Sequence, residues 1–130
     1  MRRATVTTYY HATRETLTLR AGALCVTRNR DAAEEYLDGQ SGHVYVVSLR
    51  PGLHLADASD VRSIARRLVP QSPYTRAYEL IEEHRVVRQA LIDAGYDGVE
   101  YDDETPNNAT AHDCTLVFDA IAAVASVEEV

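Results

Sequence analysis

The alternation of apolar and polar positions predicts short strands at both ends of the chain and helices between them. β-Branched and aromatic residues gather in short runs, which glycine, proline and polar clusters separate. Strands are predicted over residues 5–11, 23–26, 43–49, 99–101 and 115–118, and a further strand over 121–127 is left open. The polar stretch at 102–112 is rich in turn-forming residues, which predicts a loop.

Helical signals occupy the middle of the chain. The predicted helices span residues 32–38, 61–68 and 74–94. Asp31 is expected to cap the first, and either Asp57 or Ser59 the second. The third shows apolar residues at spacings of three and four, and Gly95 ends it. His84 lies on this apolar stripe, which predicts a core histidine with satisfied hydrogen bonds.

The order of elements, strands followed by helices and then strands, predicts an α+β fold with a small split or mixed sheet and two to three helices. No repeat or low-complexity segment divides the chain, so residues 1–130 are expected to form one domain. The chain has neither a glycine-rich P-loop nor a GxGxxG motif, which excludes the common nucleotide folds that depend on them.

Composition narrows the classes of function. The net charge of −7 excludes broad binding to nucleic-acid backbones, which needs a basic surface. No apolar run approaches the roughly 18–20 residues of a membrane span, and no apolar signal segment is present near the N-terminus. The two cysteines are too few for a disulfide scaffold, although one disulfide stays open. We therefore expect a cytoplasmic protein that does not bind membranes.

The charges are unevenly distributed. All 13 cations are arginines, and residues 1–78 carry a charge of +4 while the rest carry −11. Guanidinium groups suit bidentate contacts with phosphate, so the first part can hold a phosphate-bearing ligand. A coding bias toward arginine accounts for the same counts, and both interpretations stay open.

Three groups of residues carry candidate chemistry. The first, Tyr10-His11-Ala12-Thr13, places an imidazole, an open backbone and a hydroxyl at a strand end. The alternative is a surface loop with an incidental histidine. The five histidines of the chain are scattered without HxxxH or CxxC spacing, so no metal site is expected.

The other two groups lie on later elements. Cys25 lies on a short strand, and Tyr36 follows on a short helix where its ring can stack on a planar ligand. Asp113 stands at the start of a late strand, where a carboxylate can stabilise a developing cation. The alternatives are a core tyrosine and a charge on an edge strand.

Together these groups resemble the ADP-ribosyltransferase fold, in the branch of diphtheria-type toxins and poly-ADP-ribose polymerase catalytic domains. The resemblance covers residues 9–124 and rests on the collinear order of short motifs at 10–13, 22–36, 44–53, 95–99 and 116–119. It implies a compact split sheet and NAD as the donor of ADP-ribose.

The resemblance also implies roles for individual residues. Tyr10 opens the first NAD-binding motif, and His11 would bind the ribose next to the nicotinamide. The backbone of Ala12 would pair with the nicotinamide amide, and Thr13 would support the adenosine-side ribose. Tyr36 would stack on the nicotinamide ring.

Two positions depart from the family pattern. Cys25 stands where the family has a second stacking tyrosine, and Cys114 stands where it has the catalytic glutamate. Asp113 is the nearest acid, one residue away, and a shift by one residue on a strand faces the other side unless a bulge intervenes. Other acids that could serve are Glu100, Asp102, Asp103 and Glu104.

The sequence thus predicts a mono-ADP-ribosyltransferase that modifies a protein, of the kind found in toxins and in phage or host-defence effectors. The acidic C-terminal part favours a protein target with a basic face. The alternatives are a non-enzymatic protein-binding module on the same fold, an NAD glycohydrolase and an unrelated α+β domain.

Overall fold

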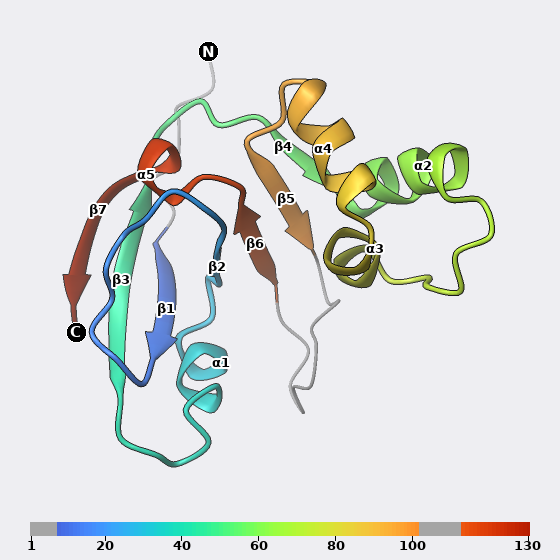
Figure 1. The fold of residues 1–130 in the computed structure, drawn as a ribbon. Helices are drawn as coiled ribbons and strands as arrows, with labels where there is room; N and C mark the ends of the chain where they lie inside the picture. The colour runs from blue at the N-terminus through green and yellow to red at the C-terminus, as the bar shows by residue number, and fades with distance from the viewer. Residues whose placement is uncertain (1–7, 102–112) are drawn as a thin grey trace.

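The computed structural model describes residues 8–101 and 113–130, which form two sheets that lie against each other, with most of the helices at one end (Figure 1). The strands are β1 (Tyr9–Thr13), β2 (Leu24–Val26), β3 (His43–Leu49), β4 (Leu55–Asp57), β5 (Gly98–Tyr101), β6 (Cys114–Val117) and β7 (Val124–Glu129). The helices are α1 (Arg30–Glu35), α2 (Ala58–Leu68), α3 (Ala77–Glu83), α4 (Arg85–Asp93) and α5 (Ala120–Ala123). No helix among these residues is long and apolar enough to cross a membrane.

One sheet has three antiparallel strands in the order β1-β3-β7. The other has four strands in the order β2-β6-β5-β4, of which β4 is parallel to β5 because helices α2, α3 and α4 connect the two. The combination confirms the predicted α+β class. A single bridge between Tyr10 and Thr27 links the edges of the two sheets, so that β1 and β2 lie side by side there.

The two larger of three apolar clusters among the described residues hold these layers together. The larger one lies where α2, α3 and α4 pack on the β4–β5 side of the four-stranded sheet, with Val61, Val87, Leu91 and Val99 fully buried. The second joins the two sheets and includes Tyr45, Val47, Val26 and Val117. Burial of such side chains stabilises the fold by roughly 1.5–3 kcal/mol each.

The prediction of one long helix over residues 74–94 is wrong, because the helical conformation is interrupted at His84. This residue has extended backbone angles, φ −123° and ψ 94°, and separates α3 from α4. Its Nε2 lies 2.7 Å from the Ser72 hydroxyl, and its ring meets the edge of Tyr74. The histidine is half-buried and hydrogen-bonded, as expected. The chain changes direction at this residue, so the apolar residues at spacings of three and four belong to two helices instead of one.

The structure identifies the residues that cap the N-termini of α1 and α2. Asn29, not Asp31, caps α1, because its side chain accepts the Ala32 N–H at 3.1 Å. Of the two candidates for α2, Asp57 forms a capping box with Asp60. Two to three helices were predicted, whereas the described residues form five. The third predicted helix is in fact two helices, α3 and α4, and the single-turn helix α5 was not predicted.

The strands follow their predicted places closely. β2, β3, β5 and β6 match within one residue, and β7 confirms the strand that was left open, although it starts only after α5. The three-residue strand β4 was missed because it is short and follows a turn. The predicted strand at 5–11 falls partly, and the loop at 102–112 wholly, outside the described residues.

Candidate functional site

A small pocket lies where β1, β2, α1 and the start of β6 meet. Its volume is about 150 Å³, and its walls are mostly apolar. The residues that line it are Tyr10, His11, Ala12, Cys25, Val26, Thr27, Ala32, Ala33, Tyr36 and Cys114. Pockets that enclose a whole drug-sized ligand measure roughly 300–1,000 Å³. This one therefore holds a single ring, and the rest of a larger ligand would lie outside it.

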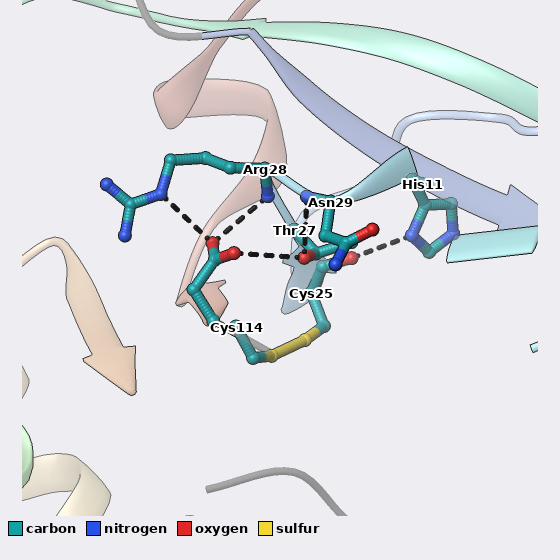
Figure 2. The surroundings of a disulfide bond; sticks show 7 residues. His11, Cys25, Thr27, Arg28, Asn29 and Cys114 are labelled. Atoms are coloured by element: carbon teal, nitrogen blue, oxygen red, sulfur yellow. Dashed lines mark hydrogen bonds and ion pairs between the residues drawn. A yellow bond between two sulfur atoms is a disulfide. The ribbon is translucent and has the colours of Figure 1, made fainter. Parts of the chain in front are cut away.

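His11 lies at the wall of the pocket on β1. Its Nδ1 is 2.7 Å from the backbone carbonyl oxygen of Cys25 (Figure 2). Since a carbonyl oxygen only accepts, Nδ1 must carry the proton in this contact. In the neutral imidazole this leaves Nε2 as an acceptor, which suits a ligand hydroxyl.

Ala12 contributes its main chain. Tyr10 and Thr27 exchange two backbone hydrogen bonds, of 2.6 and 3.0 Å, on the side of β1 away from β3. Hydrogen-bonding directions alternate along an antiparallel strand, so the N–H and C=O of Ala12 also point away from β3. Val44, opposite Ala12, bonds instead to Val130 at 2.8 Å. No other described residue bonds to these Ala12 groups, and Ala12 lines the pocket, so a backbone donor and acceptor face it together.

Tyr36 follows α1 as its C-cap and lines the pocket on the side of the helix. Its side chain is 72% exposed, although tyrosine is a large aromatic residue. Buried Ala32 and Ala33 occupy the inner face of α1, and their small side chains leave room beside the ring. The ring therefore offers an open face at the rim of the pocket.

Thr13 lies outside this group. It ends β1, and its hydroxyl accepts the Glu15 N–H at 3.3 Å, which stabilises the turn that follows. The structure therefore brings together Tyr10, His11, Ala12, Cys25 and Tyr36 from the predicted binding residues, and it leaves Thr13 beside the pocket rather than in its wall.

Asp113 lies behind the pocket wall and is firmly held. Its carboxylate accepts hydrogen bonds from the Thr27 hydroxyl at 3.3 Å, the Arg28 N–H at 3.0 Å and the Arg28 Nε at 3.2 Å. Its side chain is 13% exposed, and it is absent from the lining residues although Thr27 and Cys114 are among them. The carboxylate is thus positioned next to the pocket rather than inside it.

Arg28 was not singled out from the sequence, yet it organises the acids. Its Nη2 lies 3.1 Å from Glu100 on β5 while its Nε contacts Asp113. Partial burial lowers the pKa of Arg28, but the hydrogen bond that Arg28 donates to Asp113 and the charges of both acids outweigh this, so the pKa is raised. Two carboxylates share one guanidinium, and the formal charges of these three residues add up to −1. The other candidate acids, Asp102, Asp103 and Glu104, lie outside the described residues.

Cys25 and Cys114 form a disulfide that lies in the pocket wall, with His11 and Arg28 on opposite sides of it (Figure 2). Their Cα atoms are 6.5 Å apart and 89 residues separate them along the chain. This bridge was one of the alternatives that the sequence left open. The two cysteines that replace the tyrosine and the glutamate of the ADP-ribosyltransferase pattern are thus bonded to each other.

Among the described residues, no group of three or more histidine, cysteine, aspartate or glutamate side chains could hold a metal ion. Comparison with protein-family models, curated proteins and solved structures gives no match for the chain. The geometry of the pocket and the sequence motifs are therefore the features that point to a function.

Proposed function

We propose that the chain binds the nicotinamide end of NAD in this pocket and transfers ADP-ribose to a protein. The observation that carries the proposal is the backbone of Ala12. Its N–H and C=O face a ring-sized pocket that also has His11 and Tyr36 in its walls.

The backbone of Ala12 suits a primary carboxamide. Such a group presents an N–H donor and a carbonyl acceptor side by side, which is the complement of a peptide N–H and C=O on one strand edge. Apolar Val26, Ala32 and Ala33 would contact the flat ring, and the open face of Tyr36 would stack on it. Nicotinamide combines both features.

The remaining residues would act on the ribose and its charge. The Nε2 of His11 would accept a hydrogen bond from a ribose hydroxyl and so orient the sugar. Breaking the bond between nicotinamide and ribose develops positive charge on the sugar, which a nearby negative charge stabilises. The cluster of Asp113, Glu100 and Arg28 supplies one net negative charge behind the wall.

One observation favours a second candidate, a module that binds NAD or a protein without catalysis. Asp113 is engaged by three hydrogen bonds, and Cys114 occupies the position of the family glutamate. If no carboxylate reaches the sugar, the pocket would bind its ligand and leave it intact.

The decisive test is the release of nicotinamide from NAD by the purified protein, with and without cell lysate. A transferase requires lysate for rapid release and labels a lysate protein with ADP-ribose. Release without lysate identifies a glycohydrolase. NAD binding without release identifies the binding module, and the absence of both contradicts the proposal.

His11→Ala and His11→Asn are the matched variants for this test. The Asn amide can keep the hydrogen bond to the Cys25 carbonyl, whereas Ala loses both that bond and the contact with ribose. We expect both variants to fold and to lose release of nicotinamide by about 100-fold or more. Unchanged release in His11→Ala would show that this residue has no part in the reaction.

A further inference from the structure

The disulfide joins two strands at the point where the pocket is built. Cys25 is paired with Leu116 across β2 and β6, and Cys114 lies two residues before Leu116, so the bridge runs diagonally on one face of the sheet. Both cysteines line the pocket. Any chemistry at this bridge therefore changes the wall of the pocket directly.

The two cysteine residues differ in exposure. Cys25 is exposed, whereas Cys114 is only 7% exposed. An incoming thiolate must approach the sulfur it attacks, so Cys25 is the reachable partner and Cys114 the leaving group.

We propose that the Cys25–Cys114 bridge is a thiol–disulfide exchange site, at which a small thiol of the glutathione class controls the pocket. The thiolate attacks the Sγ of Cys25 and forms a mixed disulfide. The original S–S bond breaks, and its electron pair stays on the Sγ of Cys114 as a thiolate. A second small thiolate then attacks the outer sulfur, which releases the Cys25 thiolate and an oxidised thiol dimer.

Each step has a consequence for binding. A thiol attached to Cys25 projects into a pocket of about 150 Å³, which has no room for a second ring-sized group. Full reduction removes the covalent link between β2 and β6, but the backbone pairing of these strands remains. The adduct thus closes the pocket, and the reduced and oxidised forms leave it open. Only the effect on NAD rests on the proposed function.

The exchange is tested by incubating the folded protein in buffers of varied reduced and oxidised glutathione, followed by acid quench, alkylation and peptide mass spectrometry. Cys114→Ser leaves the exposed thiol and should take up one glutathione. Cys25→Ser leaves the buried thiol and should react at least about tenfold more slowly. Equal uptake by the two variants, or a wild-type bridge that opens only in denaturant, would overturn the exchange site.

The effect on the pocket is tested by NMR on ¹⁵N-labelled Cys114→Ser with and without its adduct. The adduct should shift the backbone amides of Ala12 and Ala33, which line the pocket, and leave that of Ile64 on α2 unchanged. An adduct that does not shift the pocket amides would overturn control of the pocket. Removal of the adduct by excess reduced thiol should then restore the NAD binding that the adduct abolishes. If NAD binds neither form, the proposed function fails while the exchange result stands by itself.

Discussion

Three residues contribute different groups to the pocket: an imidazole, a main-chain edge and an aromatic ring. His11, Ala12 and Tyr36 belong to short local motifs, and the structure brings all three to one pocket. Thr27 and Arg28 lie within a predicted motif but received no role of their own, because their importance comes from contacts with Asp113, about 85 residues further along the chain. A local pattern carries no information about such a contact. The backbone of Ala12, to which no other described residue bonds, likewise owes its position to strand pairing rather than to its side chain.

The ring of Tyr36 gives the first prediction. Tyr36→Ala should weaken NAD binding by about 0.5–1.5 kcal/mol, roughly two- to tenfold in Kd, because the stacking face is lost. Tyr36→Phe keeps the ring and should bind as the wild type does. The free energy of unfolding should change little in either variant, because the side chain is 72% exposed. Calorimetric titration checks the affinity, and equal binding by both variants would contradict stacking.

Tyr101 gives a prediction for alkaline pH. Burial raises the pKa of its hydroxyl above the ordinary value of 10.0. The folded state therefore keeps this proton after the unfolded chain has lost it, so the stabilisation is complete below pH 10 and is lost as pH rises through the raised pKa. Above pH 10 the free energy of unfolding should fall by up to about 1.4 kcal/mol per pH unit for this group.

Urea denaturation between pH 8 and 12 measures this slope. Tyr101→Phe serves as the control, because it keeps the buried ring and removes the titrating hydroxyl. Its slope should be less negative than that of the wild type. Identical slopes would show that Tyr101 does not carry the alkaline transition.

At the level of elements, the hydrophobic pattern located most strands, because alternation over four to seven residues is a strong local signal. It failed at the long helix, where apolar spacing continues without interruption through His84. At the break, His84 shares a hydrogen bond with Ser72 and meets the ring of Tyr74, and neither contact is visible in a periodic pattern. The short strand β4 was missed for a similar reason, since its pairing with β5 is a tertiary contact.

The structure shows which of the two candidate residues, Asp57 or Ser59, caps the N-terminus of α2. Asp57 accepts the Asp60 N–H at 2.8 Å, and Asp60 accepts the Asp57 N–H at 3.0 Å. Asp57→Ala should therefore lower the free energy of unfolding by about 1 kcal/mol. Ser59→Ala, in the first turn of the same helix, should change it by less than about 0.5 kcal/mol. Urea denaturation of the two variants checks this, and a larger loss in Ser59→Ala would contradict the assigned cap.

For the whole molecule, the pocket lies where the two sheets meet. β1 belongs to the three-stranded sheet and β2 to the four-stranded one, and the Tyr10–Thr27 bridge joins their edges. The apolar core between the sheets extends behind this junction. The position of the pocket therefore depends on how the two sheets are packed against each other. The sequence motifs could identify residues of the pocket, but they could not give its shape.

The disulfide should contribute to global stability. It closes a loop of about 89 residues, which lowers the conformational entropy of the unfolded chain. Reduction should therefore lower the free energy of unfolding by about 2–4 kcal/mol. Denaturation of the wild type with and without reductant measures this loss, and the Cys25→Ser/Cys114→Ser double variant is the control, since reductant should not affect it. A wild type equally stable in both conditions would contradict the bridge in solution.

We propose that the backbone of Ala12 recognises the carboxamide of NAD. The most direct measurement is an NMR titration of the ¹⁵N-labelled, oxidised protein with NAD and, separately, with nicotinic acid adenine dinucleotide, in which a carboxylate replaces the carboxamide. NAD should shift the amides of Ala12 and its pocket neighbours, and the carboxylate analogue should bind at least about tenfold more weakly, because it cannot donate to the Ala12 carbonyl. Equal binding of the two dinucleotides, or shifts confined to other surfaces, would show that the Ala12 backbone does not recognise the carboxamide.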